Sequence, residues 1–197
     1  MFMRKFLLMA LLLSAFAQAQ DSTAVNSGAE ILARRNEVRT DLLSTVMSSK
    51  FNLTYERFFS EDWSAGVTGG ITSSKNLDDD FDAGYRNSLP KYEINPFVRY
   101  KLSQSIRRFY FAEVFLSANG GDFKEIVRLT DELGNGYYVT EKSTYSDFGV
   151  GAGLGYKMYL QDKIAIELLV AFGTNLFDKD KSPDTISRVG LSVGYRF

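Results

Sequence analysis

The most constraining feature of this chain is its last ten residues, which alternate strictly between apolar and polar side chains. Every second residue from Val189 to Phe197 is apolar, and the residues between them are glycine, serine and arginine. A strand with one apolar face, one polar face and aromatic rings near its end is typical of a barrel wall between lipid and a polar interior.

Seven further segments alternate in the same way, separated by breaks rich in Gly, Ser, Asn and Asp. The sequence therefore predicts an all-β fold, an eight-stranded antiparallel up-and-down transmembrane β-barrel preceded by a cleaved signal peptide. The expected strands are 37–47, 51–59, 63–73, 92–102, 106–118, 144–159, 163–174 and 185–197.

The connections between these segments follow the rhythm of an outer-membrane barrel, in which short periplasmic turns alternate with long extracellular loops. The first hairpin, closed at 48–50, is an outer loop that departs from this rhythm by being short. The short turns are 60–62, 103–105 and 160–162, and the long loops are 74–91, 119–143 and 175–184.

The N-terminus has the three parts of a secretory signal peptide: Arg4 and Lys5, an apolar run over 6–16, and the small-residue site Ala17-Gln18-Ala19. The apolar run is shorter than the about 20 residues of a spanning helix, so cleavage is favoured over a retained anchor helix. The predicted organisation is a signal peptide at 1–19, a periplasmic lead-in at 20–36 and an outer-membrane barrel domain at 37–197.

The composition argues against several function classes. The chain contains no cysteine and no histidine, which excludes a disulfide framework and metal sites that use these ligands. Outer-membrane hydrolases and acyltransferases depend on a histidine as base or acid, so we expect no enzyme activity, no catalytic residue and no cofactor. A Ser with a Lys base or an Asp pair is the remaining alternative, but the carboxylates of the predicted strands are interpreted as ion-pair partners. Loss of Arg4 and Lys5 would leave 21 basic against 24 acidic residues, so no nucleic-acid partner is expected.

The polar face of the predicted strands carries six basic and six acidic residues. Inside the narrow interior of an eight-stranded barrel, unpaired charges would be prohibitive, whereas paired charges are tolerable. Glycines on the same face, as in the run 149–155, would leave room for long Arg and Glu side chains. We therefore expect a plugged, salt-bridged lumen. The candidate lumen ion-pair residues are Arg39, Asp41, Glu56, Glu93, Arg99, Lys101, Glu113, Asp147, Lys157, Glu167, Arg188 and Arg196.

The alternative fold is a soluble lipocalin-like barrel, which would turn the apolar face inward. The glycine-rich run at 149–155 argues against it, because glycine gains nothing on a solvent face. Two features fit the membrane barrel imperfectly. Pro96 lacks the N–H of a ladder hydrogen bond, and Phe109, Phe111 and Phe115 fall on the inward face, which requires a bulge or a partly apolar lumen.

Loop 119–143 is the most suggestive functional element, because two β-prone stretches flank Asn135-Gly136, a strong hairpin signal. We expect the fifth and sixth strands to continue beyond the membrane as a ribbon whose edges can pair with a partner. The acidic segment 78–82 is interpreted as a solvated loop tip, with Ca²⁺ binding left open. The partner-binding candidates are Ile126, Arg128, Tyr137 and Tyr138.

Five motifs resemble a bacterial outer-membrane β-barrel family of uncharacterised function, whose members are similar to OmpA- and OmpX-type eight-stranded barrels. The resemblance covers nearly all of the chain after the signal peptide and implies fold and localisation to the bacterial outer membrane, with no catalytic motif. The motifs are Asn36-Glu37-Val38 with Asp41-Leu42-Leu43-Ser44, Phe51 to Arg57, Asn95 to Tyr100, Gly151 to Lys157 and Gly194-Tyr195-Arg196-Phe197.

The expected function is envelope structure, or surface adhesion and partner binding through the extracellular loops. A subunit or anchor of a larger envelope complex is the alternative, and a small diffusion pore is a further one. The expected partners are outer-membrane lipid, an extracellular or envelope protein, and the barrel-insertion machinery, which would read the C-terminal signal Val193, Tyr195 and Phe197.

Overall fold

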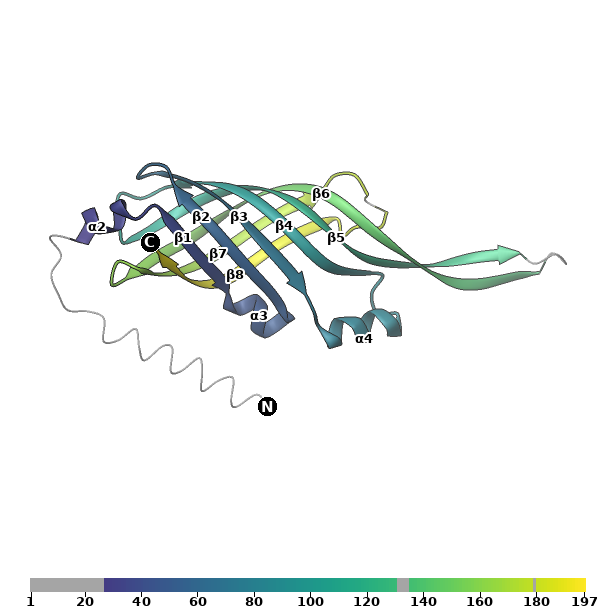
Figure 1. Cartoon of the computed structure of the whole chain (residues 1–197). Helices are drawn as coiled ribbons and strands as arrows, with labels where there is room; N and C mark the ends of the chain where they lie inside the picture. The colour runs from purple at the N-terminus through teal and green to yellow at the C-terminus, as the bar shows by residue number, and fades with distance from the viewer. Residues whose placement is uncertain (1–26, 131–134, 179) are drawn as a thin grey trace.

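A computed structural model describes residues 27–130, 135–178 and 180–197; the predicted signal peptide lies outside these residues. Eight antiparallel strands close into a barrel in sequence order (Figure 1), which confirms the predicted fold class. The strands are β1 (Asn36–Asp41), β2 (Lys50–Phe58), β3 (Trp63–Thr72), β4 (Ser88–Lys101), β5 (Arg108–Thr130), β6 (Gly136–Leu160), β7 (Ile164–Asn175) and β8 (Thr185–Arg196).

Three short helices accompany the barrel in the described ranges: α2 (Ser27–Ala33), α3 (Leu42–Ser48) and α4 (Lys75–Ala83). None of them has the length and apolar character needed to cross a membrane. Helix α2 falls in the predicted lead-in, and its Ile31 is fully buried in the same apolar cluster as Phe109 and Tyr159. The described end of the lead-in therefore packs against the barrel.

The barrel closes between its first and last strands. Asn36 and Phe197 exchange two backbone hydrogen bonds, with N···O distances of 2.9 and 2.7 Å. Beyond Asp41↔Ser192, β1 no longer pairs with β8. Helix α3 follows at this point and contacts both β8 and β2. It therefore occupies the part of the barrel wall where β1 would otherwise continue.

The outer face of the barrel is apolar and exposed. Tilted aromatic pairs, Trp63 with Tyr100 and Tyr110 with Tyr156, lie at the end with the short turns, with ring centroids 4.9 and 5.0 Å apart. Such rings are typical of a membrane interface, and an exposed apolar surface of this extent is abnormal in a soluble monomer. Exposed members include Phe51, Leu53, Val67, Ile71, Ile94, Val98, Val114, Leu116, Leu154, Leu168, Val170 and Phe172.

The predicted strand 37–47 is wrong in its second half, because helix α3 begins at Leu42. Asp41 caps this helix: its side chain accepts hydrogen bonds from the backbone N–H groups of Leu43 (3.0 Å) and Ser44 (3.2 Å). An N-cap aspartate satisfies N–H groups that otherwise have no partner in the first turn. Leu42 and Val46, which have the parity of the apolar face in the predicted strand, lie instead on this helix.

The segment 78–82 is also helical rather than a loop tip. It lies within α4, which ends at Gly84 in the left-handed conformation with φ of 88°. Because glycine adopts this conformation without steric penalty, it is a common residue at the end of a helix. Phe81 is the buried residue of α4, so this acidic segment has one side that packs against the rest of the molecule.

Pro96 is accommodated by a local change in pairing. It pairs with Val67 of β3, whereas the β4–β5 ladder runs from Ile94↔Ala118 to Phe97↔Phe115 without pairing Pro96. The register is the same on both sides of this gap, so the missing N–H interrupts the ladder to β5 without shifting the strands. The bulge of this ladder lies elsewhere, between Pro90 and Tyr92.

The inward phenylalanines are accommodated by a partly apolar lumen, and the glycines make room for them. Phe111 is paired with Gly155, and Phe115 is paired with Gly151. A Cβ atom added to Gly155 would lie 2.2 Å from Phe111 Cζ, and one added to Gly151 would lie 2.4 Å from Phe115 Cζ. The glycines of β6 therefore give space to rings, rather than directly to long charged side chains as the sequence suggested.

Candidate functional site

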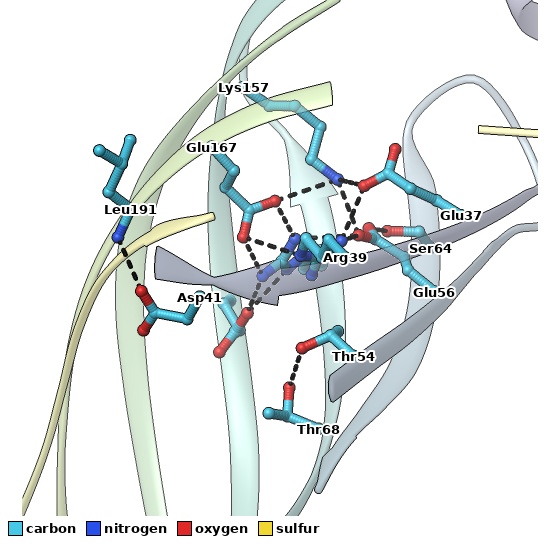
Figure 2. Close-up of polar contacts among 12 residues, drawn as sticks. Glu37, Arg39, Asp41, Thr54, Glu56, Ser64, Thr68, Lys157, Glu167 and Leu191 are labelled. Atoms are coloured by element: carbon cyan, nitrogen blue, oxygen red, sulfur yellow. Dashed lines mark hydrogen bonds and ion pairs between the residues drawn. The ribbon is translucent and has the colours of Figure 1, made fainter. Parts of the chain in front are cut away.

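Eight charged residues of the lumen form one buried group in the half of the barrel nearer the short turns, which we call the lumen cluster; Figure 2 shows part of it. Its side chains come from strands on all sides of the barrel, and nearly all are less than 5% exposed. Arg188 is the least buried, with a side chain 9% exposed. The lumen cluster consists of Glu37, Arg39, Glu56, Arg99, Glu113, Lys157, Glu167 and Arg188.

Glu56 lies at the centre of the lumen cluster. Its Oε2 atom accepts from Arg39, from Arg99 Nη1 at 3.0 Å and from Lys157 Nζ at 2.7 Å. Its Oε1 atom accepts from the Ser64 hydroxyl at 2.5 Å. A buried carboxylate is tolerated only when its oxygens are paired and hydrogen-bonded, and both oxygens of Glu56 meet this condition.

Arg99 joins opposite walls of the barrel. Its guanidinium donates to both oxygens of Glu167, at 2.7 and 2.9 Å, and through Nε to Glu113 at 2.7 Å. Its Cζ atom also lies 4.3 and 4.5 Å from the ring centroids of Phe111 and Phe97. Each guanidinium edge therefore meets a carboxylate and its plane meets aromatic rings, a combination that an arginine provides and a lysine does not.

Three candidate residues form ion pairs at the edges of the lumen cluster or away from it. Arg188 pairs with Glu113 at 2.6 Å. Glu93 pairs with Lys50 at 2.6 Å toward the outer end, and Lys101 pairs with Asp62 at 3.4 Å near a short turn.

The structure places three further candidates in roles other than ion pairing. Asp41 caps α3 and accepts from the backbone N–H of Leu191 at 3.2 Å. Asp147 accepts from the hydroxyl of Ser182 at 2.6 Å and from backbone N–H groups of the loop after β7. Arg196 donates to the Tyr159 hydroxyl at 2.7 Å and lies over the Phe58 ring, 3.7 Å from its centroid. The contacts of these three side chains are with backbone groups, hydroxyls and an aromatic ring.

Glu37 was missed by sequence reasoning, although it is fully buried within the lumen cluster. It accepts from Arg39 and Lys157, each at 2.8 Å, and from the Tyr159 hydroxyl at 2.7 Å. The sequence did carry a signal for Glu37: it lies two residues before Arg39, so both side chains fall on the same, inward face of the strand. Its position at the edge of the predicted lead-in concealed that signal.

The same cluster holds the only group of potential metal ligands within the described ranges. Carboxylate oxygens of Glu37, Glu56 and Glu167 lie within 4.8 Å of one another. Arg39 and Lys157 contact all three carboxylates. Because side-chain cations already supply the neutralising charge, the arrangement is that of an ion-pair network rather than a metal site.

A long ribbon projects from one end of the barrel (Figure 1). It is formed by β5 and β6, which stay paired without a register shift from Arg108↔Met158 to Thr130↔Gly136. Pairing of β5 with β4 extends to Phe123, and pairing of β6 with β7 begins at Gly149. Farther out, neither strand has a second neighbour among the described strands, so both ribbon edges are open.

The four partner-binding candidates lie on the ribbon but on opposite faces. Ile126, Arg128 and Tyr138 share one face, and Tyr137 lies on the other with Val127, as the pairings Arg128↔Tyr138 and Leu129↔Tyr137 show. Ile126 and Tyr138 are 73% and 71% exposed. Exposed apolar residues on a ribbon with open edges are typical of a contact surface.

Helix α4 braces the base of the ribbon. The Lys124 ammonium donates to the backbone carbonyls of Phe81 and Asp82 at the end of the helix. On the other ribbon strand, Lys142 donates to the Asp82 carboxylate at 3.0 Å. This hydrogen bond, with the charge of Lys142, lowers the pKa of Asp82 below its ordinary value.

Comparisons with known proteins agree with this fold. A family model described as "Protein of unknown function (DUF3575)" matches residues 6–191, whereas a comparison with curated proteins finds no match. The crystal structure of the N-terminal β-barrel domain of Pseudomonas aeruginosa OprF is similar with a TM-score of 0.54 and 10% identity, over 83% of this chain and 98% of that chain.

A more distant likeness is to the crystal structure of Ail, the attachment invasion locus protein of Yersinia pestis. It has a TM-score of 0.44 and 10% identity, over 83% of this chain and 99% of that chain. The OprF domain is likewise a β-barrel, and the closed eight-stranded barrel of this chain confirms the resemblance drawn from the sequence.

Proposed function

Given that the chain belongs to the DUF3575 family, whose model covers most of its length, we propose a non-enzymatic role at the bacterial outer membrane. In this proposal the barrel wall lies in lipid and the lumen does not conduct. The β5–β6 ribbon captures a protein partner outside the membrane. The open edges of the ribbon are the observation that carries the proposal.

The exposed apolar outer face supports immersion in lipid. Strands can cross a membrane only in a closed barrel, because every backbone group in hydrocarbon needs a partner. The C-terminal signal residues fit this interpretation: Tyr195 and Phe197 are both about half exposed and stack with ring centroids 6.4 Å apart. Val193, Tyr195 and Phe197 would meet lipid and, during assembly, the insertion machinery.

The lumen cluster supports a closed channel. Its ion pairs connect strands on opposite walls, so an ion that crossed the barrel would have to displace several buried pairs. Single-channel recording in planar bilayers tests this part: we expect no stable ohmic steps from the folded chain. Regular conductance steps would contradict it and favour a diffusion pore.

Main-chain pairing is the binding mode that the ribbon geometry favours. Phe148 accepts a backbone hydrogen bond from Leu176 on the β7 side, and the β5–β6 register continues unshifted outward from there. Even-numbered residues of the outer part of β6 therefore direct their N–H and C=O groups to the open edge. Thr140 is one of them, so a partner strand could add beside it.

A shortened ribbon tests capture. Replacing residues 126–140 by an Asn-Gly turn would join Glu125 to Glu141, a directly paired couple whose N–H and C=O groups face each other, and would keep Lys124 and Lys142, which contact α4. We expect the shortened chain to insert normally and to lose the proteins that cross-link to the full chain on intact cells. If the same proteins remain bound, the barrel itself is the contact surface, as in an anchor of an envelope complex.

A point substitution separates edge pairing from side-chain contact. Thr140→Pro removes one outward N–H, whereas the matched control Thr140→Ala keeps it. We expect capture to fall with Thr140→Pro and to persist with Thr140→Ala. Equal loss in both variants would contradict main-chain pairing.

A further inference from the structure

The outer half of the lumen, above the lumen cluster, contains two partly open cavities of about 230 and 290 Å³. They share Lys50, Glu93 and Ser187 in their linings and are therefore adjacent. Together they fall within the about 300–1,000 Å³ typical of small-molecule sites. This space is distinct from the ribbon, so it is independent of the proposed partner capture.

Each cavity has a buried polar atom in its lining that lacks a partner among the described residues. Asn52 lines the first cavity, and its Oδ1 atom is unpaired although the residue is 7% exposed. Tyr145 lines the second cavity, and its hydroxyl is unpaired although the residue is 4% exposed. A buried polar group without a partner destabilises the fold, and a hydrogen-bonding ligand would remove that cost.

The neutral part of the remaining polar lining consists of groups that both donate and accept hydrogen bonds. The first cavity has Thr54 and Thr68, and the second has Ser117, Asn119 and Asn175. The acidic Glu93 is already neutralised by Lys50 at 2.6 Å. Hydroxyl groups of a ligand match such a lining, because they too donate and accept.

We propose that the outer lumen binds a neutral, polyhydroxylated solute of monosaccharide size. Its hydroxyls would hydrogen-bond to the carboxamide of Asn52 and the phenol of Tyr145. In the first cavity an anion fits less well, because Arg99 and Arg188 at its base are already paired with Glu167 and Glu113. Arg86 lines the second cavity, and the phosphate titration described below tests for an anion there. The site faces the outer end of the barrel, opposite the short turns.

The test uses residues 20–197, the chain without the predicted signal peptide, folded in lipid nanodiscs. Backbone amide chemical shifts are followed during titration with D-glucose, D-galactose and N-acetyl-D-glucosamine, and separately with inorganic phosphate. Tyr145→Phe removes only the unpaired hydroxyl, and Asn52→Leu removes the carboxamide. Tyr138→Phe is the matched control, because this exposed tyrosine lies on the ribbon.

The proposal expects saturable shifts at Ser117 and Asn119 with at least one sugar. The loss of one hydrogen bond should weaken that binding about fivefold in Tyr145→Phe, with no change in Tyr138→Phe. Absence of saturable shifts with all three sugars overturns the proposal, as does unchanged affinity in both cavity variants. Phosphate that displaces the sugar or binds more tightly would identify an anion site and overturn the assignment.

Discussion

Arg99 on β4 and Glu167 on β7 form a bidentate ion pair across the barrel, with N···O distances of 2.7 and 2.9 Å. Their strands share no ladder, because β5 and β6 lie between them on one side. The pair therefore ties opposite walls together within the lumen cluster. Such a contact fixes the barrel cross-section as well as filling it.

Removal of one carboxylate from the lumen cluster should be strongly destabilising. Glu167→Gln leaves Arg39, Arg99 and Lys157 with one fewer counter-charge, and breaking a buried pair costs about 3–5 kcal/mol. We expect this loss in urea unfolding of the lipid-inserted barrel. The double variant Glu167→Gln with Lys157→Met restores the charge balance and should recover part of it. A loss below about 1 kcal/mol in the single variant would contradict the importance of the cluster.

The contact between Phe111 and Gly155 predicts a sharp intolerance of added volume. Gly155→Ala places a Cβ atom 2.2 Å from the ring and 2.7 Å from the backbone oxygen of Leu168. Overpacking of this kind costs about 1–3 kcal/mol. The control is Gly69→Ala, since nothing lies within 4 Å of a Cβ atom at that position. Equal unfolding free energies for the two alanine variants would refute the packing argument.

The cap of α3 should depend on a single side chain. Asp41→Ala removes the acceptor of the Leu43 and Ser44 N–H groups, at a cost of about 0.5–2 kcal/mol. Hydrogen exchange of these two amides should accelerate. Ser74, the N-cap of α4, makes no side-chain cap bond, so Ser74→Ala should leave exchange in α4 nearly unchanged. If exchange at Leu43 is unaffected by Asp41→Ala, the cap does not hold the helix.

The contact between α4 and the ribbon should weaken in acid. The hydrogen bond from Lys142 lowers the pKa of Asp82, so the ionised carboxylate is favoured in the folded state. The contact is therefore fully present above the ordinary aspartate pKa and is lost as the pH falls through the lowered value. Titration of Asp82 by carbon NMR should show this depression, and Lys142→Met should remove most of it, because only the smaller effect of the Lys124 charge remains. Lys75→Met on the same helix is the control and should leave the titration unchanged.

The alternation of side chains was sufficient to predict the strand number, the closed fold and the apolar outer face, because period two places alternate residues on opposite sides of a sheet. It also placed Arg99, Glu113 and Glu167 on the inner face. Parity alone does not say which inward charge meets which. Asp147 and Arg196 share that parity but bind backbone groups and a tyrosine hydroxyl.

Two elements were beyond the pattern for local reasons. The residues of α3 keep strand-like alternation at Leu42 and Val46, and only the cap by Asp41 reveals a helix. The use of the β6 glycines could not be predicted either, because the β5–β6 register decides that Phe111 and Phe115 lie over Gly155 and Gly151. Register depends on contacts between strands, and the sequence of one strand alone does not determine these contacts.

The central claim is that the apolar face of the barrel contacts lipid, and Trp63 allows a direct measurement. It is the only tryptophan of the chain, is 51% exposed on the outer face and lies beside Tyr100 at the end of the barrel with the short turns. Its fluorescence in vesicles should be quenched by lipids brominated near the headgroup more than by lipids brominated at the chain end, and little by aqueous iodide. Strong iodide quenching without lipid quenching, in a folded monomer, would contradict the account.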